Sequence, residues 1–308
     1  MASEAVPLPP QIPYRLAAKL SHSERAEVWL AHRTDGIRPV EIAVKEVYLG
    51  SNREIAHVRA NSMDTDLRHI LSFAHPNLVR HLAQYNPPEA EPKILPYYII
   101  IMEYCSGGDL HEASQFYIPA PLIQNWTRQI VDGLAYLHAL HFVHSEITGK
   151  NILLSSTDWN SCQMKIANLD TTQRFQSNMA LAKEMSKSGY EGAFTSPEGL
   201  VSGNVNHKSD IWSLGCVLLE MISGSPRFVK EVDGKQVESQ THLMAMYYIG
   251  TGGLPKIPKQ LSHELRAFVV YFLKRDPVLR PMAAELSYTN FLTLDNVSQW
   301  PDSRPLRK

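Results

Sequence analysis

Histidine is the first residue type in this chain whose spacing could support chemistry. His138, His141 and His144 recur at every third position. Neutral imidazole is the commonest metal ligand in proteins, so this spacing is compatible with a metal site. The same pattern also fits three ring side chains that pack around a loop. Both interpretations stay open at this level.

The cysteines do not extend this cluster into a larger metal site. Only three occur, far apart and without a C-x-x-C pair: Cys105, Cys162 and Cys216. Three cysteines without a C-x-x-C pair suggest neither a zinc site nor a disulfide framework, so neither is predicted and a reducing compartment fits best. The N-terminus lacks a basic region followed by an apolar stretch, and the apolar run near residues 97–102 is too short to span a bilayer. We expect a soluble, cytoplasmic protein.

Composition and charge point to an ordinary globular protein. The chain has 308 residues, of which 44% are hydrophobic, so it can bury one or two sizeable cores. Lys and Arg (30) nearly balance Asp and Glu (31). No overall field attracts a phosphate backbone or an anionic membrane, so neither nucleic acid nor membrane is an expected partner.

The pattern of elements changes once along the chain. Residues 1–13 and 295–308 read as tails. Residues 14–106 carry the strand-like runs EVWLAHR, VEIAVKEVYL and YYIIIMEY, interrupted by one helix near Ala60–Phe73. Residues 107–294 are mainly helical. This order predicts a two-lobed α+β fold.

Two long helices are predicted in the second part. The first has one apolar face, formed by Leu122, Trp126, Ile130, Leu134 and Leu137. The second covers SDIWSLGCVLLEMISG, with Ser209 and Asp210 as candidate caps and Gly224 at its end. It is apolar nearly all round, which indicates burial on most sides. The polar stretch Val229–His242 is interpreted as a loop.

A series of short motifs carries a family resemblance. They occur in this order: AVK (43–45), HPN (75–77), MEYCSGGDL (102–110), HSEITGKNILL (144–154), KIANLD (165–170), SPE (196–198), SDIWSLG (209–215) and RDPVLRP (275–281). In this order and spacing they resemble the protein kinase superfamily over about residues 14–294. The resemblance implies a bilobal fold, with a small, mainly antiparallel β N-lobe containing one helix and a larger, mainly α-helical C-lobe.

Two subgroups fit equally well. GTGGLPKIP and RDPVLRPMAAEL look like the MAP kinase kinase kinases, whereas ILLSSTDWNSCQMKIANLD looks like the autophagy-initiating kinases. Both stay open.

The resemblance implies a set of structural anchors that this chain retains. Glu198 and Arg280 match an ion pair that ties down the activation segment, and Asp210 matches a buried aspartate that holds the backbone of the catalytic loop. Since an unpaired buried charge is costly, retention of the whole set predicts a chain that still folds as a kinase lobe. His138 and His144 also match family positions, which favours packing over a metal site.

The phosphate-binding parts match the family less well. The three glycines of the family's Gly-rich loop fall on Ser21, Ser23 and Ala26, whose side chains hinder close approach of the backbone to a phosphate. Lys45 matches the strand lysine that contacts the phosphates. Its usual glutamate partner aligns with Asp66, which is one methylene shorter.

The catalytic loop is also altered. Glu146 stands where the resemblance places an aspartate base, so a carboxylate remains but is displaced. Ser145 replaces the arginine that reads a phosphorylated activation loop, and Thr148 replaces the lysine that steadies the transferring phosphate. Asn151 matches an asparagine that holds a second magnesium ion, or it bonds the loop backbone instead.

The decisive change implied by the resemblance is at Asn168. A neutral carboxamide stands where a carboxylate normally grips magnesium, and Asp170 lies two residues beyond that place. We therefore predict no metal site and expect no efficient two-metal catalysis.

The apolar side of a nucleotide pocket has counterparts in the chain. Val28, Ala43 and Leu153 match residues that sandwich adenine, Met102 matches the gatekeeper, and the backbone of Glu103 and Cys105 would meet the purine edge. These residues either bind a purine with little metal or simply fill a core. ATP is a candidate cofactor, whereas Mg²⁺ is doubtful.

Three functions follow from this pattern. The first is a pseudokinase that serves as a scaffold or allosteric regulator of another signalling protein, with an active kinase among the candidate partners. The second is a weak or atypical Ser/Thr kinase that uses Lys45, Glu146 and Asn151. The third is a nucleotide sensor that binds ATP without catalysis. The sequence indicates neither a particular partner nor an oligomeric state.

Overall fold

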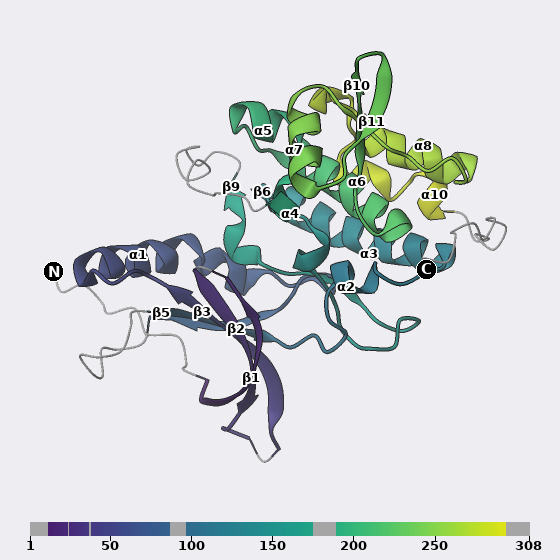
Figure 1. Ribbon diagram of the computed structural model, residues 1–308. Coiled ribbons are helices and arrows are strands. Elements are labelled where there is room, and N and C mark those ends of the chain that lie inside the picture. Colours follow the sequence, from purple (N-terminus) through teal and green to yellow (C-terminus); the bar gives the residue numbers. More distant parts are fainter. Residues whose placement is uncertain (1–11, 24, 37, 87–96, 175–188, 294–308) are drawn as a thin grey trace. The chain divides into compact units, whose positions relative to one another are not determined.

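The computed structural model describes residues 12–23, 25–36, 38–86, 97–174 and 189–293, and the chain divides into two compact units, Met1–Cys105 and Ser106–Lys308 (Figure 1). The first is called the N-terminal unit below and the second the C-terminal unit. Antiparallel strands dominate the first and helices the second, so the predicted α+β class is confirmed. No helix among the described residues is long and apolar enough to cross a membrane.

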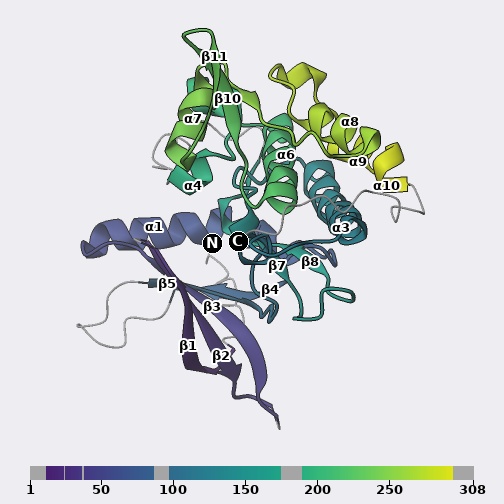
Figure 2. The ribbon, with the colours of Figure 1, turned by 45° about the vertical axis from the view of Figure 1, so that its right-hand side comes forward.

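The N-terminal unit is built on a five-stranded antiparallel sheet in the order β1-β2-β3-β5-β4 (Figure 2). Its strands are β1 (Tyr14–His22), β2 (Ala26–Arg33), β3 (Val40–Tyr48), β4 (His81–Tyr85) and β5 (Tyr97–Glu103). The runs predicted as strands correspond to β2, β3 and β5. Their β-branched and aromatic residues fit the pleated surface of a sheet.

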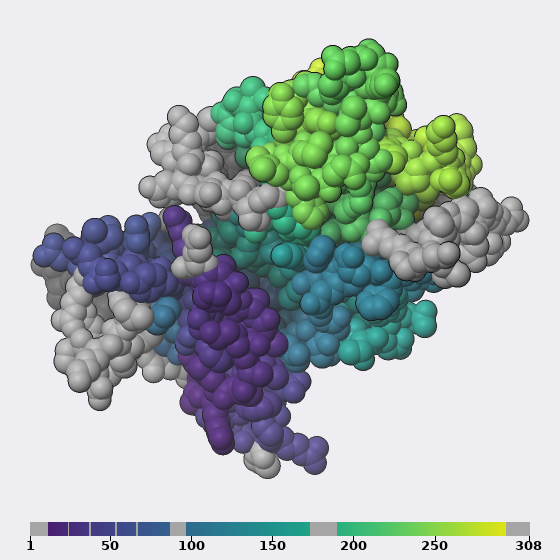
Figure 3. Space-filling model, viewed as in Figure 1, coloured from purple at the N-terminus to yellow at the C-terminus, as the bar shows by residue number. Residues whose placement is uncertain are grey.

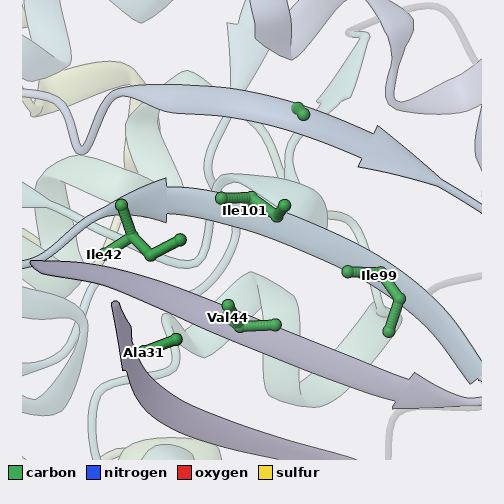
Figure 4. Close-up of a cluster of buried hydrophobic side chains, with 6 residues drawn as sticks. Ala31, Ile42, Val44, Ile99 and Ile101 are labelled. Atoms are coloured by element: carbon green, nitrogen blue, oxygen red, sulfur yellow. The ribbon is translucent and has the colours of Figure 1, made fainter. Parts of the chain in front are cut away.

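One face of this sheet carries an apolar cluster (Figure 4). Ile42 and Val44 lie two residues apart on β3, and Ile99 and Ile101 do the same on β5. Side chains alternate between the faces of a strand, so each pair points to the same side. Ile12, in the segment predicted as a tail, also packs against this cluster.

The helix of this unit begins earlier than predicted. α1 spans Arg53–Asp66, and its N-cap Asn52 accepts a hydrogen bond from the Ile55 N–H at 3.1 Å. A separate 3₁₀ turn covers Arg68–Ser72. Much of α1 is polar and exposed, so its first turns lack the apolar periodicity on which the prediction depended.

The C-terminal unit contains nine α-helices within its described residues. They are α2 (Leu110–Ala113), α3 (Ala120–Ala139), α4 (Gly189–Gly192), α5 (Pro197–Ser202), α6 (His207–Ser223), α7 (His242–Gly250), α8 (His263–Phe272), α9 (Ala283–Leu286) and α10 (Asn290–Thr293). The 3₁₀ turns are η2 (Gly149–Asn151), η3 (Leu169–Thr171) and η5 (Pro277–Leu279). Short strands form three small sheets: β6 (Phe142–Val143) with β9 (Gln173–Arg174), β7 (Ile152–Leu154) with β8 (Met164–Ile166), and β10 (Phe228–Val232) between β11 (Lys235–Glu238) and β12 (Leu254–Pro255).

The helix α6 is the buried centre of this unit and contacts α3 and α8. Its buried character and its end at Gly224 are confirmed, since Gly224 adopts a left-handed conformation with φ of 78°. The predicted caps were wrong. Asn206 is the N-cap. Ser209, at the third position of the helix, accepts a hydrogen bond from the Asn206 N–H through its Oγ and completes a capping box. Asp210 lies one residue further inside the helix.

The prediction of a loop near Val229–His242 is wrong for the first half of this segment. Strands β10 and β11 form a hairpin there, and α7 begins at His242 (Figure 1). This segment belongs to the green surface in Figure 3. The turn consists of Asp233 and Gly234, both with positive φ, at 51° and 72°. Asp-Gly between two strand-like runs is a strong hairpin signal, which the polar character of the strands obscured.

Candidate functional site

The predicted nucleotide-binding residues fall in both units. In the N-terminal unit, Val28 on β2 is the register partner of Lys45 on β3, and Ala43 on β3 is the partner of Met102 on β5. The sheet therefore brings these four side chains to neighbouring positions. Leu153 lies on β7 of the C-terminal unit. The nucleotide pocket itself stays a prediction.

Glu103 and Cys105 are the other residues of the N-terminal unit that were expected at the nucleotide site. The side chain of Glu103 accepts a hydrogen bond from the Arg80 N–H at 2.7 Å, and Cys105 is buried and free of disulfide bonds. The side chain of Asp66, the expected partner of Lys45, lies outside what the structure describes.

The turn between β1 and β2 replaces the expected glycine loop. The Ser23 N–H donates to the Ala26 carbonyl at 2.8 Å, and the Ala26 N–H donates to Ser23 Oγ at 3.1 Å. Two backbone donors that could otherwise face a phosphate are thus used to close the hairpin. Ser21 pairs with Val28 within the sheet.

In the C-terminal unit, the loop between β6 and β7 is held by a buried carboxylate. Asp210 Oδ2 accepts from the His144 N–H at 2.8 Å and lies 2.9 Å from His138 Nε2, and Oδ1 accepts from the Ser145 N–H at 2.9 Å. Burial opposes ionisation of Asp210, but the hydrogen bond and charge of His138 outweigh it, so its pKa lies below the usual range. Ser145 adopts a positive φ of 72° at this point.

The ring of His144 is locked in one orientation. Its Nε2 lies 2.8 Å from the Ala167 carbonyl, and its Nδ1 lies 3.2 Å from the Glu146 N–H. This geometry requires a neutral ring with the proton on Nε2. Burial lowers the pKa of His144, which agrees with the neutral form.

The side chains of Glu146, Asn151 and Asn168 contact one another around this loop. The Asn168 amide donates from Nδ2 to Glu146 Oε2 at 2.8 Å. The Asn151 amide donates from Nδ2 to the Glu146 carbonyl at 2.8 Å, which is the structural alternative considered for this residue. The amide donors at both metal-ligand positions are therefore directed at Glu146.

The backbone of Asn168 is held in the left-handed region, with φ of 59° and ψ of 39°. It precedes η3, in which Leu169 is fully buried and Thr171 Oγ1 donates to the Asn168 carbonyl at 2.8 Å. Asn tolerates this conformation better than most residues, so the local backbone suits the amide. Asp170 lies inside η3, beyond the expected metal position.

Two hydroxyl groups of the loop have no hydrogen-bond partner among the described residues. They are the buried Oγ of Ser145 and the buried Oγ1 of Thr148. Both residues line a small pocket that also includes Glu146 and Glu191.

Two of the expected anchors, Glu198 and Arg280, form a network with neighbouring side chains. Arg280, whose side chain is fully buried, donates from Nη1 and Nη2 to the two oxygens of Glu198 at 2.7 and 2.8 Å. Ser209 adds a third bond to Glu198 at 2.8 Å, and the guanidinium lies 5.1 Å from the ring centroid of Trp212. Burial opposes ionisation of Glu198, but the hydrogen bonds and charge of Arg280 prevail and lower its pKa.

Two of the three regularly spaced histidines hydrogen-bond to protein groups. His138 bonds Asp210, and His144 bonds the Ala167 carbonyl. Among the described residues, no three His, Cys, Asp or Glu side chains form a group that could hold a metal ion.

Sequence reasoning missed a second buried acidic centre. Glu220, fully buried on α6, accepts from Tyr190 OH at 3.1 Å and lies 2.7 Å from His111 Nδ1. Burial raises the pKa of Glu220, and the hydrogen bond to Glu220 raises the pKa of His111. A Cβ on Gly149 would collide with the carboxylate of Glu220, so a larger residue there would displace this carboxylate. A lone glutamate inside the apolar run LLEMI was the available signal.

Three known proteins that resemble this chain are protein kinases of one kind. Residues 19–292 match the family described as protein kinase domain. The chain is 33% identical over 254 residues to mitogen-activated protein kinase kinase kinase 3 of Arabidopsis thaliana, covering 81% of this chain and 38% of the relative. It is 30% identical to the mitogen-activated protein kinase kinase kinase MST11 of Pyricularia oryzae, with coverage of 82% and 27%, and 32% identical to YODA of Arabidopsis thaliana, with coverage of 79% and 25%.

These similarities confirm the resemblance to MAP kinase kinase kinases, and the resemblance to autophagy-initiating kinases stays a prediction. The chain spans less than two fifths of the length of each of these relatives.

Proposed function

The chain belongs to the protein kinase family, and on this premise we propose that it works as a pseudokinase. In this proposal it is a scaffold or allosteric regulator of another signalling protein, and it does not transfer phosphate at a useful rate. The proposal depends on one observation above all, the hydrogen bond from Asn168 to Glu146.

This hydrogen bond bears on both the metal and the base. Magnesium prefers oxygen ligands and usually a carboxylate, whereas Asn168 is neutral and directs its N–H₂ group at Glu146. Glu146 is the residue that would accept the proton of an incoming hydroxyl. One oxygen of Glu146 accepts a hydrogen bond from the Asn168 amide. The residue at the expected metal position and the residue at the expected base position therefore bind each other.

Nucleotide binding is a separate matter. A protein kinase domain implies ATP binding, and we propose that ATP binds here with little dependence on Mg²⁺. Closure of the Ser23–Ala26 turn by its own donors supports weak binding of the phosphates. The adenine side would depend on Val28, Ala43, Met102 and Leu153.

The proposed partner is another signalling protein in the cytoplasm, with a catalytically active kinase among the candidates. The retained anchor residues support this role, because a stably folded helical unit can bind a partner whether or not it transfers phosphate. The relatives named above are mitogen-activated protein kinase kinase kinases, which makes another protein kinase the first partner to test.

A weak Ser/Thr kinase is the second candidate. One observation favours it: Asp210 still holds the loop that presents Glu146 through backbone bonds at 2.8 and 2.9 Å. A carboxylate on a rigid loop could retain some activity, since the effects of clustered residues need not add.

Transfer of labelled γ-phosphate from ATP separates the two candidates. The wild-type chain is compared with K45A and E146A, and with K256A as a control at an exposed lysine that pairs with Glu238. We expect the wild type to show no more transfer than K45A. Transfer by the wild type and K256A that is abolished in both K45A and E146A would overturn the pseudokinase proposal.

A further inference from the structure

One pocket in the C-terminal unit is lined by side chains whose hydrogen bonding is incomplete. Thr148 is only 2% exposed, and its Oγ1 has no partner. The buried Oγ of Ser145 has none either. Leaving a buried hydroxyl unsatisfied costs on the order of 1 to 3 kcal/mol, so two of them at one pocket call for a ligand.

The other hydroxyl groups around this pocket are already bonded. Ser213 Oγ donates to the Phe194 carbonyl at 2.8 Å, and Thr195 Oγ1 lies 3.3 Å from the Glu191 carbonyl. The unmet hydrogen-bonding capacity is therefore confined to Ser145 and Thr148, on the loop side of the pocket.

The charge of the lining is one-sided. Glu146 and Glu191 are acidic, and the lining residues within the described part of the chain include no lysine, arginine or histidine. A carboxylate offers about four acceptor positions, and a hydroxyl can also accept. The pocket therefore presents acceptors to whatever occupies it, and its charge favours a cation.

Size and ligand geometry narrow the choice of cation. The pocket has room for about one water-sized group, which suits an ammonium group and is too small for a planar guanidinium. A divalent metal is disfavoured, because no group of three metal-ligating side chains occurs in the described part of the chain. An ammonium group carries three donors on a compact centre, and the four side chains supply acceptors for them.

We propose that this pocket, formed by Ser145, Glu146, Thr148 and Glu191, binds the ammonium group of a lysine side chain presented by a partner protein. The side-chain stem would run outward through the open side of the pocket. The inference goes beyond the pseudokinase proposal and does not depend on it, since it concerns what the loop recognises and not whether it transfers phosphate.

The test is a titration of the whole chain with Nα-acetyl-lysine-N-methylamide at constant ionic strength. The readout is the backbone amide resonances of residues 145–148 in ¹⁵N-labelled protein. The arginine and norleucine counterparts have similar reach but a larger head or no charge. We expect saturable shifts with the lysine compound and at least about tenfold weaker binding of the other two.

Two variants tie the binding to this pocket. T148K should supply an ammonium group from the chain itself, abolish lysine binding and raise Tm above that of T148M, which has similar length and no charge. E191Q removes one carboxylate charge and should weaken binding at least about tenfold, which keeps the test valid if T148K fails to fold. Equal binding of the lysine and norleucine compounds, no binding at all, or retention of an ordered water there at saturating ligand would overturn the proposal.

A negative result would leave the proposed function unaffected. Phosphate transfer abolished by K45A and E146A would overturn that function, whereas failure of lysine binding concerns only the pocket. The two outcomes are measured separately and cannot be confused.

Discussion

Two regions of the C-terminal unit treat their polar groups in opposite ways. In the anchor network, formed by Glu198, Arg280 and Asp210 with their neighbours, every one of these three charged groups meets several partners. The loop edge is formed by Ser145, Glu146, Thr148 and Asn168. There the Glu146 carboxylate accepts a hydrogen bond from the Asn168 amide, and the two buried hydroxyls have no hydrogen-bond partner among the described residues.

This difference separates the residues that stabilise the fold from the residues that would carry out the chemistry. The anchor network connects α5, α6 and the segment after η5, so its loss would leave buried charges without partners. The loop edge contributes less to stability, because the side-chain hydrogen bond between Asn168 and Glu146 joins two of its own members. A chain under demand to fold but not to transfer phosphate would keep the first region and let the second change.

The largest expected effect is on the anchor network. R280M removes a fully buried guanidinium and leaves Glu198 without its bidentate partner, which should lower the free energy of unfolding by about 3 to 5 kcal/mol. Urea denaturation measures this effect. The matched control is R227M, because the Arg227 side chain is 42% exposed and its pair with Glu238 is long at 3.5 Å, so a loss below about 1 kcal/mol is expected. Equal losses in both variants would contradict the distinction.

The second effect tests the carboxylate that joins the two regions. D210N presents an N–H₂ group to at least one of the donors that Asp210 now accepts from, and should cost about 2 to 3 kcal/mol at pH 7. Because the folded-state pKa of Asp210 is depressed, its contribution is present above its ordinary value near 3.9 and is lost as pH falls through the lower folded value. The wild-type advantage over D210N should therefore shrink below about pH 4. An advantage that stays constant in acid would argue that Asp210 is not ionised in the folded state.

The third effect concerns the Glu220 centre, which behaves as a further anchor. The folded-state pKa of His111 is raised, so its stabilising contribution is complete below its ordinary value near 6.5 and is lost as pH rises through the folded value. We expect a loss of under about 1 kcal/mol between pH 6 and 8. Thermal unfolding of H111Q, which cannot titrate, should lack this part of the pH dependence. An identical pH profile in both proteins would contradict the assignment.

The smallest expected effect is at the loop edge and has the opposite sign. S145G removes a buried hydroxyl without a partner and suits the positive φ of 72°, so it should stabilise the chain by up to about 1 kcal/mol. S145A removes the hydroxyl but keeps a Cβ in the left-handed region, and should gain less. If S145G is destabilising by more than S145A, the edge makes a larger contribution to the fold than its contacts indicate.

Much of the fold could be predicted from the sequence because its signals are local. Runs of β-branched and aromatic residues marked β2, β3 and β5, and the apolar face from Leu122 to Leu137 marked α3. The start of α1 was missed because its exposed first turns carry no apolar stripe. The β10–β11 hairpin was missed because the signal of Asp233-Gly234 was outweighed by the polarity of its strands.

The candidate site was predictable in its residue types but not in its contacts. Motif order indicated Glu146, Asn151 and Asn168, yet no sequence pattern shows that both amides are directed at Glu146. Side-chain orientation depends on the backbone, here the left-handed conformation of Asn168, and on neighbours distant in sequence. The buried Glu220 centre has the same origin, since α2, α4 and α6 supply its members.

The most direct test of the account is the magnesium dependence of ATP binding in the wild type and in N168D. Thermal unfolding is measured with millimolar ATP, once with Mg²⁺ and once with EDTA. We predict that the wild-type Tm is the same in both, whereas N168D, with a second carboxylate facing Glu146, gains stability only when Mg²⁺ is present. Ligand at about 100 times its Kd adds about 2.7 kcal/mol, so the shift is measurable. A wild-type Tm that rises with Mg²⁺ as much as that of N168D would contradict the claim that Asn168 has removed the metal site.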